Sequence, residues 1–200
     1  MGATTFHLIR HASYDRLGRA LAGREPGHAL NAAGRAEAAQ LAATLRGRAL
    51  AAVVSSPIER AQETARHIAA PHGLEVLVEP GLTEIDFGAW TGMAFQDLRD
   101  TPGWIAFNTF RSTAPTPGGE TMLAAQARAV AALVRLAARH PGAELAAVSH
   151  GDIVKALLAH ALGTPLDLLR RIEIDPASRS VIALEERDAR VLGINLPPWA

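Results

Sequence analysis

Cysteine is absent from the 200 residues of this chain, which excludes disulfide bonds, thiol catalysis and cysteine-ligated metal sites. Lysine occurs once, at Lys155, so arginine supplies nearly all of the positive charge. No apolar run is long enough to span a bilayer, and the first residues, MGATTFHLIR, lack the features of a secretory signal. We therefore expect a soluble, cytoplasmic protein with no membrane partner.

The chain also lacks an excess of charge of either sign. Lys and Arg together number 20, as do Asp and Glu, so the formal net charge is zero. Nothing in this balance suggests nucleic acid or an anionic membrane surface as a partner. Hydrophobic residues make up 48% and charged residues 20%, a globular composition that suits a single domain over residues 1–200. The oligomeric state is open, and a homodimer is possible.

A metal site is not indicated, although the chain has eight histidines. His67 and His72 lie on either side of Pro71, so they do not share a regular helix face. The HExxH pattern of zinc peptidases does not occur. We expect neither a metal nor another cofactor.

Short apolar runs alternate with alanine-rich helical stretches, which predicts an α/β fold. The expected strands are residues 4–9, 51–55, 74–78, 144–149, 180–184 and 191–195. The expected helices are residues 32–46, 57–70, 120–139 and 152–162. This order predicts a three-layer α/β/α sandwich with a largely parallel central sheet. Only EERDA separates the last two strands, which suits a hairpin, so we expect an antiparallel strand near the C-terminal edge.

Two helices carry more specific expectations. Ser56 is a candidate N-cap for helix 57–70, with Pro57 in the first turn and Glu59 completing a capping box. In helix 120–139 an apolar stripe that includes Leu123 and Val134 is expected to face the core. Residues 86–118 have no long periodicity and hold several aromatic residues. We expect a loop-rich cap there, whose aromatic residues pack it onto the core or stack on a substrate ring.

Polar side chains follow four of the expected strands, at the end where ligands bind to parallel α/β sheets. They are Arg10 with His11, Arg60, Glu84 with Asp86, and His150 with Gly151. Arginine matches phosphate oxygens with two parallel hydrogen bonds, and a helix N-terminus adds free N–H donors. A neutral histidine among such cations can be a nucleophile, and a nearby carboxylic acid can protonate a leaving oxygen. The set therefore favours phosphoryl chemistry.

Four segments resemble the motifs of the histidine phosphatase superfamily, also called the phosphoglycerate-mutase-like family. They are LIRHAS, SSPIERAQET, LTEIDFGAWTG and VSHGD, and they occur in the order typical of the family. The resemblance implies a metal-independent phosphatase that acts on a small phosphorylated metabolite. It implies that His11 becomes phosphohistidine and that Glu84 protonates the leaving group. Arg10, Arg60 and His150, with Gly151 at the helix start, would hold the phosphoryl oxygens.

Two positions differ from the family pattern. Ala12 stands where glycine usually follows the nucleophilic histidine, and Leu17 stands where many members have an asparagine that binds phosphate. Ser13 and Arg24 are candidate accessory ligands, with Arg16 as an alternative to Arg24.

Other interpretations remain open. Asp86 is the rival of Glu84 for the acid role. A phosphoglycerate mutase would share the same pocket, although residues 93–118 contain only two arginines where such mutases have a basic insertion. A protein of another class, a catalytically inactive binder of phosphate ligands, would keep the pocket and lose turnover.

Overall fold

The computed structural model describes residues 2–186 and 188–199. Six strands are assigned: Thr4–Arg10 (β1), Leu50–Ser55 (β2), Val76–Val78 (β3), Glu144–Ser149 (β4), Arg179–Leu184 (β5) and Ala189–Leu196 (β6). The α-helices are Ala32–Leu45 (α1), Glu59–Ala69 (α2), Phe95–Leu98 (α3), Pro102–Thr109 (α4), Met122–Arg139 (α5) and Gly151–Leu162 (α6). Short 3₁₀ turns occur at Ala70–His72, Pro80–Leu82, Gly88–Trp90 and Leu166–Arg171.

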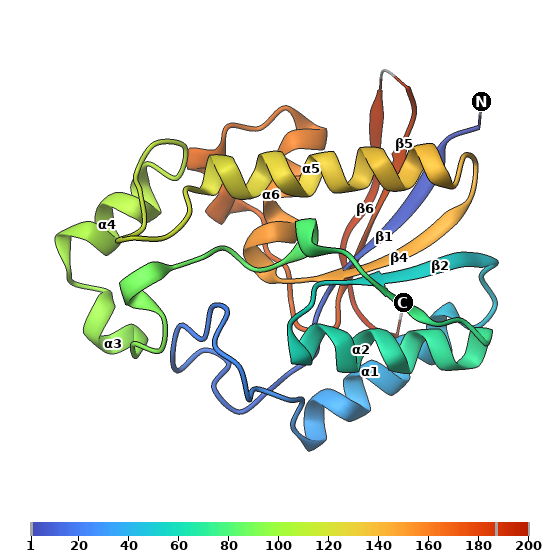
Figure 1. Cartoon of the computed structure of the whole chain (residues 1–200), viewed down its shortest axis with the longest axis horizontal. Coiled ribbons are helices and arrows are strands. Elements are labelled where there is room, and N and C mark those ends of the chain that lie inside the picture. Colours follow the sequence, from blue (N-terminus) through green and yellow to red (C-terminus); the bar gives the residue numbers. More distant parts are fainter. Residues whose placement is uncertain (1, 187, 200) are drawn as a thin grey trace.

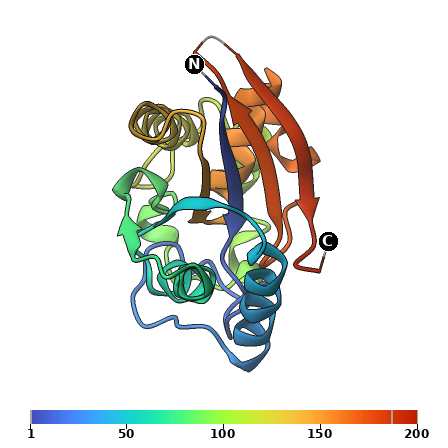
Figure 2. The same ribbon diagram turned by 90° about the vertical axis from the view of Figure 1, so that its right-hand side faces the viewer.

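The strands form one mixed sheet in the order β3-β2-β4-β1-β5-β6. The four strands from β3 to β1 are parallel, whereas β5 and β6 run antiparallel to their neighbours. Figures 1 and 2 show this sheet between two helical layers, with α5 and α6 on one face and α1 and α2 on the other. The predicted fold class is confirmed, including the antiparallel C-terminal hairpin.

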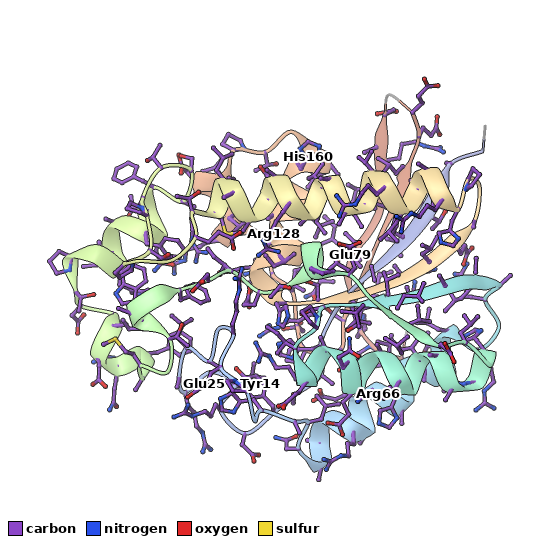
Figure 3. All side chains as sticks on the ribbon, in the orientation of Figure 1. Tyr14, Glu25, Arg66, Glu79, Arg128 and His160 are labelled. Atoms are coloured by element: carbon purple, nitrogen blue, oxygen red, sulfur yellow. The ribbon has the colours of Figure 1, made fainter. Side chains whose placement is uncertain are left out.

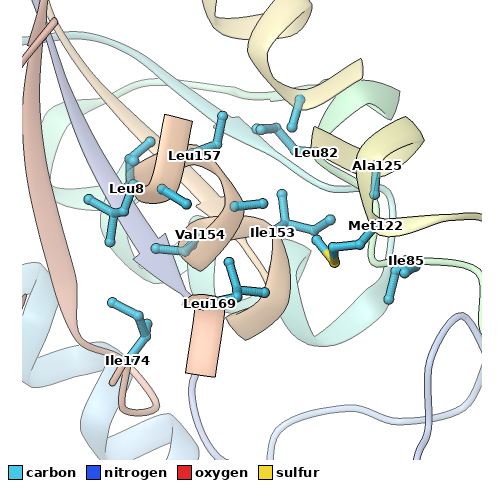
Figure 4. Close-up of a cluster of buried hydrophobic side chains, with 14 of the residues drawn as sticks. Leu8, Leu82, Ile85, Met122, Ala125, Ile153, Val154, Leu157, Leu169 and Ile174 are labelled. Atoms are coloured by element: carbon cyan, nitrogen blue, oxygen red, sulfur yellow. The ribbon is translucent and has the colours of Figure 1, made fainter. Parts of the chain in front are cut away.

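Each face of the sheet has its own hydrophobic core. On one face Leu8 and Leu145 pack with Met122 of α5 and with Ile153 and Leu157 of α6. Figure 4 shows part of this cluster around Leu8, Ile153 and Leu157. On the other face the alternate residues of the same strands, such as Ile9 and Val148, pack against α1 and α2. Burial on both faces explains why consecutive residues of a central strand, such as Leu8 and Ile9, are both apolar.

The expected apolar stripe of α5 was partly wrong. Leu123 and Val134 are 55% and 53% exposed, and the buried face is formed largely by small residues such as Ala125, Ala129 and Ala132. Alanine at these positions lets the chain pack closely: a Cβ on Gly81 would lie 2.6 Å from the Cβ of Ala132. A hydrophobicity pattern does not measure how closely two segments approach, so it did not identify the buried face of α5.

The predicted capping box of α2 is also wrong. The helix begins at Glu59, with Ile58 at the N-cap and no capping side chain. The Ser56 hydroxyl accepts from the Ile58 N–H at 3.3 Å, before the helix starts, and contacts His150 Nε2 at 2.8 Å, while the Glu59 carboxylate accepts a hydrogen bond from the Gly27 N–H. Both side chains are therefore engaged in tertiary contacts.

The segment 86–118 forms a cap over one end of the sheet and contains the short helices α3 and α4 (Figure 1). Its aromatic rings pack on one another: the ring of Trp90 lies 5.4 Å from Trp104 and 5.6 Å from Phe107 between centroids. Phe107 and Trp90 also belong to the main core, so the rings hold the cap against the body of the protein.

Within the described residues, no helix has the length and apolar character needed to cross a membrane.

Candidate active site

A cavity of about 270 Å³ lies where the polar groups that follow the parallel strands meet. Its lining includes Arg10, His11, Arg60, Glu84 and Gly151, which come from four separate places in the sequence. A larger groove of about 700 Å³ runs between α1 and α2, but none of the predicted site residues lines it. The smaller cavity is therefore the candidate site.

His11 is buried and held in one tautomer. Its Nδ1 lies 2.9 Å from the carbonyl oxygen of Ala12. Because a carbonyl can only accept, Nδ1 carries the proton and Nε2 keeps its lone pair. Burial first, and then the Arg60 guanidinium, lower the pKa of His11 well below its ordinary value. The ring is therefore neutral at pH 7, with an unprotonated Nε2 available as a nucleophile.

Arg60 joins the groups of the site. Its Nε donates to His11 Nε2 at 3.1 Å. Its Nη2 donates to the Gly23 carbonyl at 2.8 Å and to His150 Nδ1 at 3.3 Å. Its Nη1 is buried and has no hydrogen-bond partner among the described residues. An unpaired buried guanidinium donor is costly unless a ligand supplies the acceptor. Arg60 therefore has a donor free for an anion.

Arg10 lies at the tip of β1, next to the start of α6. Its Nη1 donates to the Ile174 carbonyl at 2.6 Å, while its buried Nε has no partner among the described residues. A Cβ on Gly151 would lie 3.3 Å from that Nε, so glycine lets the guanidinium lie close to the helix N-terminus. The cation and the free N–H groups of the first helical turn together favour an anion.

His150 lies behind the cavity lining and is completely buried. Its Nδ1 accepts from Arg60, so its Nε2 carries the proton and donates to Ser56 Oγ at 2.8 Å. Burial, followed by the charge of Arg60, lowers the pKa of His150 well below its ordinary value. The imidazole rings of His11 and His150 lie 5.2 Å apart between centroids.

Glu84 supplies a carboxyl group to the same cavity. Its Oε2 lies 3.9 Å from His150 Nδ1, and its side chain is 13% exposed. Burial, and then the nearby carboxylate of Asp152, raise the pKa of Glu84 to about 7. A carboxyl that titrates near neutrality can both donate and accept a proton at physiological pH. Asp86, the rival, is 44% exposed and forms an ion pair with Arg24 at 3.6 Å.

The backbone around Glu84 is fixed by several hydrogen bonds. Arg24 Nε and Arg128 Nη2 donate to the Glu84 carbonyl at 2.8 and 3.1 Å. Ser149 Oγ donates to the Leu82 carbonyl at 2.7 Å. Arg128, labelled in Figure 3, reaches this segment from α5. Arg24 therefore binds the chain that carries Glu84 and does not line the cavity.

The other accessory residues are placed as follows. The Ser13 hydroxyl donates to Glu37 Oε1 at 2.8 Å, so it is engaged away from the cavity. Ala12 is fully buried, and its N–H donates to Thr64 Oγ1 at 3.1 Å. Leu17 lines the cavity and offers no polar atom to a phosphate. Arg16 pairs with Glu25 at 2.7 Å.

Four polar residues line the cavity that were not predicted as site residues from the sequence. Tyr14, labelled in Figure 3, lies on the loop after β1, with the Arg60 guanidinium 5.1 Å from its ring centroid. Arg111, Asp152 and Lys155 form a charged wall. Lys155 is the only lysine and Tyr14 the only tyrosine of the chain, so rarity marked both in the sequence. The described part of the chain shows no cluster of three or more His, Asp or Glu side chains that could hold a metal ion.

Comparisons with known proteins find curated relatives that align with most of this chain. Phosphoserine phosphatase 1 of Hydrogenobacter thermophilus is 31% identical over 197 residues, covering 94% of this chain and 90% of its own length. The adenosylcobalamin/alpha-ribazole phosphatase of Escherichia coli is 29% identical over 194 residues, covering 94% of each chain. A bifunctional protein of Mycobacterium tuberculosis is 36% identical over 133 residues, which are 66% of this chain but only 36% of that protein. The chain thus spans about a third of the length of that relative.

Solved structures share the whole fold. The Bacillus stearothermophilus protein YhfR superimposes with a TM-score of 0.90 at 27% identity, over 96% of this chain and 97% of its own. The mycobacterial glucosyl-3-phosphoglycerate phosphatase gives a TM-score of 0.87 at 26% identity, over 97% and 99% of the two chains. The family model described as histidine phosphatase superfamily (branch 1) matches residues 6–197. This chain belongs to the histidine phosphatase superfamily.

Proposed function

We propose that the chain is a metal-independent phosphoric monoester hydrolase that forms a phosphohistidine on His11. The observation that carries the proposal is the unprotonated Nε2 of His11, 3.1 Å from Arg60 Nε inside a cage of cationic donors. The names of its relatives, which include phosphoserine and alpha-ribazole phosphatases, support small phosphomonoesters as substrates.

In the first step the lone pair of His11 Nε2 attacks phosphorus as the bond between phosphorus and the ester oxygen breaks. Arg10, Arg60 and the N-terminus of α6 bind the phosphoryl oxygens, and their fixed donors stabilise the charge that develops there. The Nε2 lone pair of His11 accepts from Arg60 Nε in the structure. When the phosphoryl oxygens accept from Arg60 instead, this lone pair becomes free to attack phosphorus. The protonated carboxyl of Glu84 gives its proton to the leaving oxygen, so an alcohol departs.

In the second step water attacks the phosphohistidine. The Glu84 carboxylate left by the first step takes a proton from that water, and the phosphorus–nitrogen bond breaks as inorganic phosphate forms. His11 recovers its neutral form with the proton on Nδ1, and Glu84 is again a carboxylic acid. Its pKa of about 7 suits both halves of the cycle.

Hydrolysis is favoured over mutase chemistry by the charges of the cap. A mutase retains a bisphosphate between its half-reactions and needs additional cations to do so. The two arginines of residues 93–118 are not both available to bind the second phosphate of a bisphosphate. Arg99 is 71% exposed and lies beside Asp100, whereas Arg111 is buried in an ion pair with Asp152.

The direct test is to trap the phosphoenzyme. Wild type mixed with a radiolabelled phosphomonoester and quenched rapidly should carry acid-labile phosphate, and His11→Ala should carry none. We expect His11→Ala to lower kcat/KM by a factor of about 10³ or more, because it removes the nucleophile.

His67→Ala is the matched control, because Arg66-His67 repeats the Arg-His dipeptide on the surface of α2, and it should retain both labelling and turnover. Label that persists in His11→Ala would refute the assignment. Binding of phosphate esters by wild type with neither label nor turnover would identify a catalytically inactive binder.

A further inference from the structure

The proposed reaction uses one wall of the cavity only through Asp152, whose carboxylate raises the pKa of Glu84. Arg111 of the cap and Asp152 and Lys155 of α6 line the cavity beyond the phosphate-binding groups. Three charged side chains are seldom buried together without a polar ligand or mutual pairing. The pairing among them shows which charge is left over.

Arg111 and Asp152 neutralise each other. Arg111 Nη1 lies 2.8 Å from Asp152 Oδ2, and Nη2 donates to Asn108 Oδ1 at 2.9 Å. The Arg111 guanidinium also stacks on the Phe107 ring, 4.3 Å from its centroid. These contacts hold Arg111 in place, so its charge balances that of Asp152.

Lys155 gives this wall one positive charge in excess, because Asp152, whose pKa Lys155 also lowers, is already paired with Arg111. The Lys155 side chain is only 17% exposed, and within the described residues its ion pair is with Glu173, at 3.9 Å. Glu173 is 79% exposed, and a pair of that length to a solvated carboxylate contributes little. A carboxylate from solution can therefore replace Glu173 at small cost.

The position of Lys155 relates this charge to the phosphate. Gly151, beside Arg10, and Lys155 are four residues apart on α6, so they lie on the same face of the helix. Four residues of helix rise roughly 6 Å. A second anionic group would thus bind about one helical turn from the phosphoryl group.

The remaining walls limit the size and polarity of the ligand. Leu17, Leu21, Phe87 and Trp104 line the cavity and offer mainly apolar surface. The volume of about 270 Å³ is below the range of about 300–1,000 Å³ usual for small-molecule pockets. A short substrate fits such a site better than a nucleotide-sized one.

We propose that Lys155 binds a carboxylate of the substrate, so that the preferred substrates are phosphate esters of short hydroxy acids. The proposal rests on the phosphatase function above for its catalytic consequence, whereas the binding of the carboxylate does not depend on turnover. Lys155 thereby acts as a specificity-determining residue.

The test compares esters that differ only in the carboxylate. We would measure kcat/KM for 3-phosphoglycerate beside glycerol 3-phosphate, and for O-phosphoserine beside O-phosphoethanolamine. Wild type should prefer the carboxylated member of each pair. Lys155→Met should reduce that preference about ten- to a hundredfold, the range expected for a lost charge-assisted hydrogen bond. Lys155→Arg should restore most of it.

Arg139→Met is a control for the loss of one positive charge. Arg139 is exposed at the C-terminal end of α5, just before β4 enters the sheet, and the site lies at the opposite end of β4. In Arg139→Met, the ratio of kcat/KM between the carboxylated and the uncarboxylated ester should equal that of wild type. The proposal would be overturned if wild type preferred the esters without a carboxylate. It would also be overturned if Lys155→Met kept the wild-type preference for the carboxylated esters.

Binding separates this proposal from the catalytic one. In the His11→Ala background, calorimetry with 3-phosphoglycerate and glycerol 3-phosphate should show tighter binding of the former, and adding Lys155→Met should abolish the difference. That result together with an inert wild type would refute the hydrolase and support the carboxylate site. Turnover by wild type with equal affinities would support the hydrolase and refute the carboxylate site.

Discussion

At the scale of single residues, the site depends on groups whose protonation is set by their surroundings. His11 and His150 are neutral because they are buried beside Arg60, whereas Glu84 is kept partly protonated at pH 7 by burial and by Asp152. Burial raises the pKa of Asp152, but the charge and hydrogen bond of Arg111 together with the charges of Lys155 and Arg10 outweigh it, and the net pKa is lowered. Two carboxyl groups in one cavity therefore carry different charges.

The pKa of Glu84 predicts how activity depends on pH. The acid role needs the protonated form, which is lost as pH rises through about 7. For alkyl phosphates, the rate of phosphoenzyme formation should fall about tenfold per pH unit above that value. Esters of good leaving groups, such as p-nitrophenyl phosphate, should lack this fall. Rapid-quench measurements of phosphoenzyme formation across pH 5 to 9 check both expectations.

Glu84→Gln should slow alkyl esters by about 10²–10⁴-fold and remove the fall above neutrality. Asp86→Asn is the matched control, since Asp86 lies two residues further on and is 44% exposed. If Asp86→Asn had the larger effect, the acid role would pass to Asp86.

The sequence was sufficient to find the residues that follow the strands but not the pairs that form across the cavity. Arg10 ends β1, and His11 and His150 directly follow β1 and β4, where side chains of a parallel sheet converge on one edge. The pairing of Arg111 with Asp152 joins residues 41 positions apart, and it depends on how the cap folds over α6. No local pattern carries that information.

At the scale of elements, the first turn of α1 packs against the loop that carries His11. A Cβ on Gly34 would lie 1.9 Å from the carbonyl oxygen of Ser13, two residues after His11. The Asn31 side chain caps this helix by accepting from the Gly34 N–H at 2.8 Å. At α2, by contrast, the helix begins three residues after Ser56, and the Glu59 side chain binds the Gly27 N–H, so the expected capping box does not form.

Gly34→Ala should therefore be destabilising although alanine favours helices. The backbone of the loop has to move, which we expect to cost about 2–3 kcal/mol in the free energy of unfolding. Because the loop carries His11, kcat should fall as well. Gly47→Ala, where a Cβ would meet nothing within 4 Å, is the control and should change stability by less than about 0.5 kcal/mol. Urea denaturation of both variants measures their free energies of unfolding. Equal stability of Gly34→Ala and Gly47→Ala would contradict the prediction.

At the scale of the whole molecule, the cap and the sheet share one core. Phe107 of α4 is fully buried and clusters with Leu8 of β1 and Ile153 of α6. The general prediction of a cap over residues 86–118 followed from its aromatic and Gly/Pro content. Its two short helices were not predictable, because α3 has four residues and α4 eight, too few for a clear periodicity.

The shared core predicts that the chain unfolds in one cooperative transition. Phe107→Ala should lower the free energy of unfolding by about 3–5 kcal/mol, as expected for a large buried ring. Phe110→Ala is the control, because Phe110 is 57% exposed and should contribute little. Differential scanning calorimetry that showed a separate cap transition in wild type would contradict a single domain.

The Arg10–Ile174 contact has a consequence for biosynthesis. The Arg10 guanidinium, at the end of β1, donates to the carbonyl of Ile174, which lies 164 positions later in the chain. The backbone N–H of Arg10 donates to the Ser178 carbonyl. A nascent chain on the ribosome can assemble β2, β4 and the cap before those acceptors emerge. Arg10 then lacks both anchors, so catalytic competence should arise only after residues 174–178 have emerged and folded against β1.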